Sequence, residues 1–261
     1  MKMNQNWNAE KYSSDFSFVH EYGNDVISLI DLKNARSVLD LGCGNGALSK
    51  VLAEKGLIVT GMDASEDMLA VARKNCPGIR FHRADATDFT LEESVDAVFS
   101  NAVFHWIDKS RQEDMMRCVY QALNDGGQFV FEMGGTGNNR LIHTALAQEF
   151  TKLGYTYTMP FYFPSIGEYA AMLEKTGFTV RCAVLFDRPT RLNGEDGLTD
   201  WIKMFVKNPF VNVTEDDRQV ILKKAVSALA PALYKDGVWY SDYVRLRMKA
   251  VKENTGNSIL V

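Results

Sequence analysis

Three aspartates stand at the ends of short apolar segments of this chain, each about one strand-and-helix unit from the next. Asp40 lies in VLDLG, Asp63 ends LIVTGMD, and Asp85 lies in RADATDF. In an open α/β sheet, ligands bind beyond the carboxyl ends of the strands, where the strand order reverses. We therefore expect the three carboxylates to face one crevice, which suits a cationic, hydroxyl-rich ligand. A helix cap or a solvated loop would explain one such acid, and Asp85 alone fits that interpretation equally well.

A glycine run follows Asp40 in LGCGNGA. Dinucleotide-binding loops have the spacing G-x-G-x-x-G, and here Ala47 stands at the third glycine, which some such loops accept. Asp40 is the stronger argument against a dinucleotide, because its carboxylate would repel the pyrophosphate. S-adenosylmethionine has no phosphate and carries a sulfonium and an ammonium, so it would benefit from both the bare backbone and the acid. Asp63 could then accept from the ribose hydroxyls, as it would in a dinucleotide site, and Asp85 from the adenine amine.

Strands and helices alternate over residues 36–133 and would position these acids. Five apolar segments predict strands: RSVLDLG, LIVTGMD, GIRFHRAD, VDAVFSN and GGQFVFEM. Helical patterns lie between them in ALSKVLAEKG, SEDMLAVARKN and KSRQEDMMRCVYQALN, and Ser65 is the expected N-cap of the second. Strands this apolar, separated by helices, predict a parallel sheet covered on both faces.

Further elements flank this core on both sides. Residues 7–32 form an amphipathic, aromatic-rich stretch, and helices are predicted around residues 139–153 and 165–176. GFTVRCAVLFD predicts a sixth strand and DYVRLRMKAVK a seventh. The helical patterns of residues 193–238, between these two strands, are too short for a separate domain and indicate a lid.

Composition excludes several classes of protein. The chain has 261 residues and a formal net charge of −4, without a long basic cluster, which disfavours capture of nucleic acid or an anionic membrane. Its four cysteines are scattered without metal-ligand spacing, so we expect reduced thiols, no metal and a cytoplasmic protein. The N-terminus is polar where a signal peptide would be apolar, and no run reaches the ~18–20 apolar residues of a membrane span.

Four motifs carry a resemblance to a known family. VLDLGCGNG, GMDASEDML, ADATDF and FSNAVFHWI resemble successive motifs of the class I S-adenosylmethionine-dependent methyltransferases. FEMGGTGNN, YFPSIGEYAAMLEKTGF, FDRPTRL and DYVRLRMKAVK are similar to the trans-aconitate methyltransferase-like (type 11/25) branch. The resemblance covers nearly the whole chain. It implies one α/β domain over residues 1–261, with a Rossmann-like seven-stranded, mostly parallel sheet, helices on both faces, an antiparallel last strand, and a helical insertion between strands six and seven.

The resemblance also divides this domain and assigns its cofactor site. It implies an N-terminal helical cap over residues 1–34, a cofactor-binding core over 35–135 and the helical lid over 193–238. The implied contacts with S-adenosylmethionine are Asp40, Gly42 and Gly44 at the methionine end, Asp63 and Ala64 at the ribose, Asp85 and Ala86 at the adenine, Met68 on the adenine face, Asn101 and Ala102 at the amino-acid end, and Tyr12 and Phe18 closing over the cofactor.

Methyl transfer from a sulfonium depends mainly on alignment and on the exclusion of water. A carboxylate acceptor is already ionised at neutral pH, whereas a hydroxyl or an ammonium needs a base. His105, just past the fourth predicted strand, is the nearest candidate for that base. The alternative is that His105 and Trp106 only form a wall of the pocket or hold the turn.

The resemblance suggests a small organic acid as the acceptor, and arginine suits a carboxylate best. Arg140, after the glycine-rich GGTG turn, is the first candidate. Arg188, Arg191 and Arg245 are weaker candidates, because a strand-end turn and an exposed sheet edge would explain them equally well. Trp106, Tyr240 and Tyr243 are further candidates to contact the substrate, and the two tyrosines could hydrogen-bond an acceptor or pack in a core. The sequence shows no pair of arginines that clearly converges on a tricarboxylate site.

The leading interpretation is transfer of methyl from S-adenosylmethionine to a small molecule, at a carboxylate oxygen. Three alternatives are a nicotinamide-dependent oxidoreductase, which Asp40 disfavours, a cofactor-binding protein without catalysis, and an N- or C-methyltransferase acting on a small molecule that is not an acid. SNAV stands where nucleic-acid and protein methyltransferases of the NPPY type carry their tetrad, which disfavours planar nitrogen acceptors. The sequence leaves a monomer and a homodimer both open.

Overall fold

A computed structural model describes residues 18–254, with side-chain positions from residue 23 onward. One continuous sheet has the order β3-β2-β1-β4-β5-β8-β6, and the short β7 pairs with β8 outside this path. The strands are β1 (Ser37–Leu41), β2 (Ile58–Asp63), β3 (Arg80–Arg83), β4 (Val95–Asn101), β5 (Leu123–Gly134), β6 (Phe178–Arg191), β7 (Tyr234–Lys235) and β8 (Val238–Lys252). The first five strands run parallel, and β8 is antiparallel to both β5 and β6. The predicted seven-stranded sheet with an antiparallel last strand is therefore confirmed.

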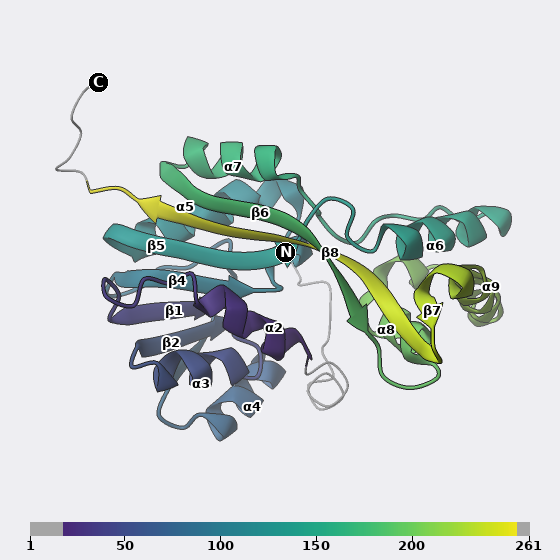
Figure 1. Cartoon of the computed structure of the whole chain (residues 1–261), viewed down its shortest axis with the longest axis horizontal. Helices are drawn as coiled ribbons and strands as arrows, with labels where there is room; N and C mark the ends of the chain where they lie inside the picture. Colours follow the sequence, from purple (N-terminus) through teal and green to yellow (C-terminus); the bar gives the residue numbers. More distant parts are fainter. Residues whose placement is uncertain (1–17, 255–261) are drawn as a thin grey trace.

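Helices cover both faces of this sheet (Figure 1). They are α2 (Phe18–Ile27), α3 (Ala47–Glu54), α4 (Glu66–Asn75), α5 (Gln112–Ala122), α6 (Arg140–Lys152), α7 (Ile166–Lys175), α8 (Gly197–Phe205) and α9 (Glu215–Leu233), with 3-10 turns at Phe104–Trp106, Lys109–Arg111 and Asn208–Phe210. Side chains at the starts of several helices form the expected caps. Ser65 accepts from Met68 N–H in α4, and Thr214 accepts from Asp217 N–H in α9.

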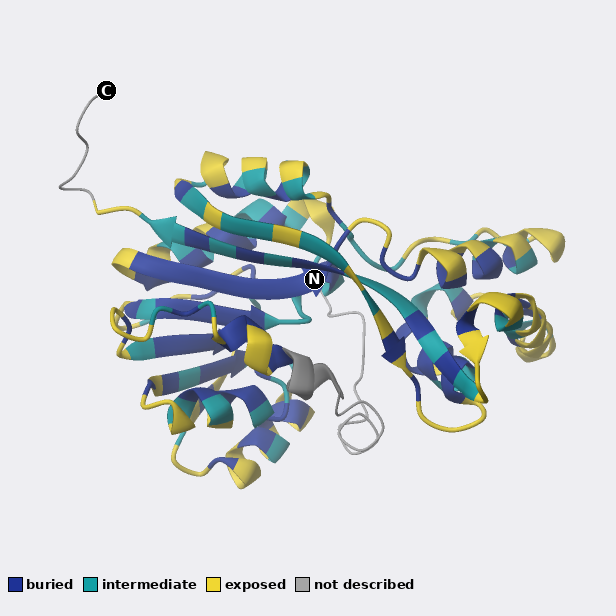
Figure 2. Ribbon diagram, viewed as in Figure 1, coloured by how far each residue is buried: buried dark blue, intermediate teal, exposed yellow. Residues whose placement is uncertain are grey.

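Alternate residues of each central strand enter different hydrophobic clusters. Val38 and Phe99 pack on one face with α2 and α3, whereas Leu39 and Val98 pack on the other face with α5 and α7. Because both faces are covered, these strands are buried along most of their length, as Figure 2 shows for β1, β4 and β5.

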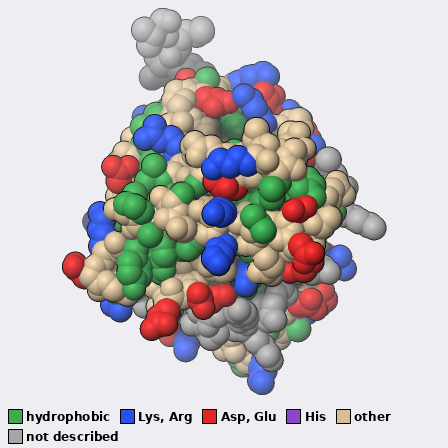
Figure 3. All heavy atoms as spheres, turned by 90° about the vertical axis from the view of Figure 1, so that its right-hand side faces the viewer, with side chains coloured by type: hydrophobic (Ala, Val, Ile, Leu, Met, Phe, Trp, Pro, Cys, Tyr) green, Lys and Arg blue, Asp and Glu red, His purple; other side chains and the backbone are tan. Residues whose placement is uncertain are grey.

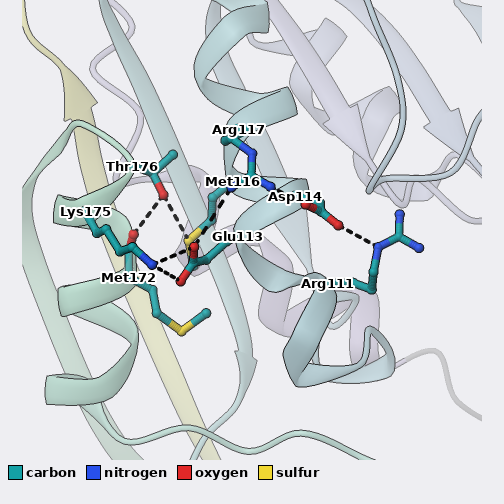
Figure 4. Close-up of polar contacts among 8 residues, drawn as sticks. All are labelled: Arg111, Glu113, Asp114, Met116, Arg117, Met172, Lys175 and Thr176. Atoms are coloured by element: carbon teal, nitrogen blue, oxygen red, sulfur yellow. Dashed lines mark hydrogen bonds and ion pairs between the residues drawn. The ribbon is translucent and has the colours of Figure 1, made fainter.

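Polar contacts join α5 and α7 above the second face (Figure 4). The Lys175 ammonium donates to both Glu113 carboxylate oxygens, at 2.8 and 2.9 Å. Within α5 and the turn before it, Arg111 and Arg117 both reach Asp114. The buried contact is Tyr169 O–H donating to Gln112 Oε1 at 2.8 Å, which fixes the two helices more firmly than the exposed ion pair does.

The edge strand β6 and its neighbour β8 are both longer than predicted from the sequence. β5 ends where Gly134 pairs with Arg245, but β6 and β8 stay paired as far as Arg191 and Tyr240. This two-stranded ribbon leaves the sheet and carries a helical lobe formed by α6, α8, α9 and β7 (Figure 1). The lobe has its own core, which includes Trp201, and α6 belongs to it although α6 precedes β6 in the chain.

Surface charge on the lobe is mixed. Figure 3 looks onto the lobe end of the molecule, where basic, acidic and apolar side chains are interspersed. Within residues 18–254, no helix combines the length and the apolar character needed to cross a bilayer.

The packing of the lobe core predicts that two leucines of α6 contribute very differently to the free energy of unfolding. Leu146 is fully buried, and truncation to alanine should reduce the free energy of unfolding by about 2–5 kcal/mol. Leu141 is 41% exposed, so Leu141→Ala should change it by less than about 0.5 kcal/mol. Urea denaturation followed by tryptophan fluorescence measures both variants. Equal effects of the two substitutions would contradict the packing of α6 into the lobe.

Candidate functional site

The glycine run forms a tight loop between β1 and α3. Gly42, Gly44 and Gly46 have φ angles of 80°, 55° and 80°, in the left-handed region that glycine adopts without strain. At Gly42 a side chain is also excluded by space, because a Cβ would lie 2.2 Å from Cγ2 of Val103. The run therefore lets the backbone turn directly against the segment that follows β4.

Asp40 lies beneath this loop rather than at its surface. Its side chain is buried and its Oδ2 accepts from the Ser49 hydroxyl of α3 at 2.5 Å. Burial, together with the nearby charge of Asp63, raises the pKa of Asp40 to about 7, against the lowering effect of the Ser49 hydrogen bond. A cation brought to the loop would favour the charged form of this carboxyl group.

Asp63 ties the loop to the start of α4. Its Oδ2 accepts from Gly44 N–H at 2.9 Å and its Oδ1 from Ser65 N–H at 2.8 Å. Burial raises the pKa of Asp63 despite these hydrogen bonds. Because each carboxylate oxygen can accept twice, Asp63 retains the capacity to accept from two ligand hydroxyls. Ala64, the next residue, is half-buried. Met68 of α4 is buried, and its Cε would lie 3.2 Å from a Cβ added at Gly44.

The third acid lies beyond β3. Asp85 is half-buried, and its Oδ1 accepts from both the N–H and the hydroxyl of Thr87, at 2.9 and 2.8 Å. Arg111 donates to the same hydroxyl and so supports this turn from the start of α5. Ala86 is half-buried at its tip. Among residues 18–254 no hydrogen bond to Asp85 Oδ2 is found, so that oxygen is available to a donor.

Asn101 and Ala102 end β4 on the same edge of the sheet. Ala102 has a φ of 61°, unusual for a residue with a side chain, and its N–H donates to the Glu132 carbonyl oxygen at 2.8 Å. Asn101 is half-buried and pairs with Glu132 across the β4–β5 ladder. Of the two aromatic residues expected over the cofactor, Tyr12 and the side chain of Phe18 both lie outside the described part of the chain.

The backbone N–H groups of the glycine loop distinguish between a dinucleotide and S-adenosylmethionine as the cofactor. A pyrophosphate is bound by free backbone N–H groups of such a loop. Here they are used internally: Gly42 and Cys43 donate to Met62 O at 2.7 and 3.0 Å, Gly44 to Asp63, and Gly46 to Cys43 O at 3.0 Å. With these N–H groups occupied and two acids at the loop, the residues present fit the cationic S-adenosylmethionine and not a dinucleotide.

His105 lies in the 3-10 turn after β4 and is buried. Its Nδ1 accepts from Gly134 N–H at 3.3 Å, so the proton of the neutral ring is on Nε2. Burial, aided by the positive charge of Arg245, holds the pKa of His105 well below its usual range. At neutral pH this imidazole is a hydrogen-bond donor through Nε2–H, and it lacks a free lone pair with which to accept a proton.

A cavity of about 660 Å³ lies in front of His105 and Trp106. The loop over residues 155–162 forms a second wall, and Asn208, Pro209, Asn212 and Val213 of the insertion form a third. Trp106 packs edge-on against Phe161, with ring centroids 4.7 Å apart. The cavity therefore lies between the sheet and the helical lobe.

Aromatic contacts connect this cavity to the ribbon. The Trp106 ring lies 6.3 Å from Phe205, which lies 5.3 Å from Trp201, and the Trp201 indole N–H donates to Tyr243 O–H at 2.7 Å. Trp106 and Tyr243, both predicted to bind substrate, are thus linked through the lobe core. Tyr240 is half-buried at the far end of the ribbon, opposite Arg191.

Three arginines converge on one buried carboxylate of the protein itself. Glu132 of β5 accepts from Arg188 of β6 at 2.6 and 3.1 Å, and from Arg245 and Arg247 of β8 at 3.1 and 2.9 Å. These charges hold the pKa of Glu132 below its usual range, although burial alone would raise it. Arg140, the first candidate, is instead exposed at the start of α6, where its charge acts on Asp242.

Glu132 and Arg247 were not among the functional residues predicted from the sequence. One signal was available, because FVFEM places a single acid inside an apolar strand, and a buried acid requires a cationic partner. Which cation pairs with it depends on strand register. Glu132 lies opposite Arg247, and Arg245 stands two residues before Arg247 on β8, opposite Gly134.

Known proteins share similarity with this chain in sequence and in fold. A family model described as a methyltransferase domain matches residues 38–127. An uncharacterized methyltransferase of Schizosaccharomyces pombe is 33% identical over 261 residues, spanning 95% of this chain and 98% of the relative. Trans-aconitate 2-methyltransferase of Methylobacterium nodulans is 26% identical over 237 residues, spanning 87% and 90%. The crystal structure of an S-adenosylmethionine-dependent methyltransferase from Mesorhizobium loti has a similar fold, with a TM-score of 0.53 at 20% identity, covering 89% of this chain and 97% of that one.

The raised pKa of Asp40 predicts a pH dependence of stability. The unfolded chain loses this proton near pH 3.8, and the folded protein loses it only near 7. Between these values the folded state binds the extra proton, so the free energy of unfolding should fall as pH rises. Urea denaturation across this range should show that slope reduced in Asp40→Asn and unchanged in Asp67→Asn, an exposed control in α4. An equal slope in wild type and Asp40→Asn would contradict the assignment.

The Glu132 cluster predicts a large stability loss. Glu132→Gln leaves three mostly buried guanidinium groups without a counter-charge and should cost about 3–5 kcal/mol of unfolding free energy. Glu253→Gln removes an exposed partner of Arg181 and should cost less than about 1 kcal/mol. Thermal and urea unfolding measure both. A loss below 1 kcal/mol in Glu132→Gln would show that the cluster does not hold the strands together.

Proposed function

The chain belongs to the class I S-adenosylmethionine-dependent methyltransferases, and on that premise we propose that it methylates a small-molecule acceptor at a carboxylate oxygen. The observation that carries the proposal is the state of His105. A hydroxyl or ammonium acceptor must lose a proton to become nucleophilic. His105 is buried and neutral, and its Nδ1 is engaged by Gly134, so it does not serve as that base. A carboxylate requires none.

The relatives support the same acceptor chemistry. The Methylobacterium nodulans protein is named for trans-aconitate, a carboxylic acid, and its similarity spans most of both chains. The positive charge of Arg245, a member of the arginine cluster, acts on His105, which lines the cavity, and such a charge suits an anionic acceptor.

Residues at the loop edge would hold the cofactor. S-adenosylmethionine supplies a methyl group made electrophilic by its sulfonium. Asp63 would accept from the ribose hydroxyls, Asp85 from the adenine amine, and Asp40 would stabilise the positive end through the loop. Asn101 and Ala102, with Gly42 and Gly44, would pack against the amino-acid end, and Ala64, Met68 and Ala86 would enclose the adenosine.

The helical lobe would exclude water from the reaction. Residues of the insertion already form one wall of the cavity, at Asn208 to Val213. We propose that residues 193–238 act as a lid over the acceptor. Alignment in a closed, dry cavity is the main contribution that a protein can make to a displacement of this kind.

A binding and transfer experiment tests the function. S-adenosylhomocysteine should bind in calorimetric titration, NAD should not, and Asp63→Ala should weaken the former at least tenfold. Labelled methyl from S-adenosylmethionine should pass to members of a panel of carboxylic acids and be released by mild base as from a methyl ester.

His105→Gln keeps a donor near Nε2 and should retain activity within about tenfold, whereas loss of a general base reduces the rate by about 10²–10⁴-fold. Transfer to alcohols or amines alone, or a hundredfold loss in His105→Gln, would refute the carboxylate proposal.

A further inference from the structure

The Glu132 carboxylate has no remaining capacity to accept hydrogen bonds. Its Oε1 accepts from Arg188 and Arg245, and its Oε2 from Arg188 and Arg247. Two oxygens with two lone pairs each are then fully used. Three guanidinium groups around one carboxylate also leave two positive charges uncompensated within the cluster.

Arg245 is the member of the cluster with donors to spare. It is only 7% exposed, and it donates to Glu132 through Nε alone, at 3.1 Å. Across residues 18–254, neither of its two terminal nitrogens makes a hydrogen bond. Arg188, by contrast, gives both terminal nitrogens to Glu132, and Arg247 gives Nε and one terminal nitrogen. The terminal nitrogens of Arg245 are not among the buried polar atoms that lack a partner, so they stay accessible from solvent although most of the residue is buried. A bound ligand can therefore reach these unused donors.

The position of Arg245 places these donors beside the candidate site. Arg245 lies opposite Gly134 in the β5–β8 ladder, and the N–H of Gly134 donates to His105, which lines the cavity. The positive charge of Arg245 adds to the effect of burial in lowering the pKa of the His105 imidazole. His105 and Arg245 are therefore neighbouring residues at the carboxyl end of β5, where β5 and β8 run side by side (Figure 1), and both carry hydrogen-bond donors.

Glu132 also fixes the direction of this guanidinium. With Nε held at Glu132 and the ring of Tyr243 5.7 Å from its central carbon, Arg245 has little rotational freedom left. A planar guanidinium held at Nε presents its two terminal nitrogens as a fork that matches a carboxylate.

We propose that Arg245 binds a carboxylate of a bound ligand through its two terminal nitrogens, with Glu132 as its positioning residue. The assignment rests on the proposed function, because it takes the β4–β5 edge as the reaction site. Two ligands there carry a carboxylate: the acceptor and the methionine end of the cofactor. Because Glu132 pairs with Asn101 in the β4–β5 ladder, the arginine cluster lies close to the expected methionine end of the cofactor as well as to the acceptor.

The test compares Arg245→Lys and Arg245→Met with wild type in the full-length protein. Either substitution leaves Glu132 with Arg188 and Arg247, so the fold should persist, and urea denaturation checks that it does. Arg181→Met is the matched control, since Arg181 is an exposed arginine of β6. The probes are S-adenosylhomocysteine, methylthioadenosine, which lacks the amino-acid carboxylate, and trans-aconitate added to protein saturated with S-adenosylhomocysteine.

Each outcome decides the proposal. If Arg245 binds the acceptor, trans-aconitate should bind at least 30-fold more weakly to Arg245→Met and several-fold more weakly to Arg245→Lys, with S-adenosylhomocysteine unaffected. If it binds the cofactor, S-adenosylhomocysteine should weaken at least tenfold while methylthioadenosine does not. Unchanged binding of S-adenosylhomocysteine, together with unchanged or absent binding of trans-aconitate, overturns the assignment. Failure of the proposed function would be separate, because it would appear in wild type as the absence of a base-labile methyl ester.

Discussion

The carboxylate of Glu132 joins the parallel sheet to the antiparallel ribbon. It lies on β5, the last of the parallel strands, and accepts from arginines of both β6 and β8. A buried carboxylate separated from all of its cationic partners would be strongly unfavourable, so the three strands must keep this register. The ribbon continues from this point into the helical lobe, and the lobe forms one wall of the cavity. The ion cluster therefore helps to set the position of the lobe wall of this cavity.

Charge is distributed unevenly along the carboxyl edge of the sheet. At the β1 and β2 end, Asp40 is buried and Asp63 is half-buried, and within residues 18–254 neither is bonded to a basic side chain. Desolvation raises the pKa of both. At the β5 and β8 end, positive charge exceeds negative charge around Glu132. A cationic ligand at the first end and an anionic ligand at the second would each relieve an electrostatic cost of the folded protein. A sulfonium donor and a carboxylate acceptor match this polarity.

His105 lies where these two halves meet, and its environment makes it a poor proton acceptor. Buried beside a guanidinium and engaged at Nδ1, it offers only a donor to the cavity. The chemistry proposed for this site accordingly depends on the alignment of two charged ligands and on the exclusion of water by the lobe.

The sequence by itself determined the parallel core and its loop edge. Apolar segments, helix caps and the glycine run are local signals, and the ends of parallel strands necessarily share one edge. The placement of Asp40, Asp63 and Asp85 along that edge could therefore be predicted from the sequence. The arginine cluster was decided only by tertiary structure, because Glu132, Arg188 and Arg245 are far apart in the chain and meet through strand register. The length of the ribbon and the packing of α6 with the insertion also depend on long-range pairing. Periodicity shows which face of a segment is apolar, but not which distant segment covers it.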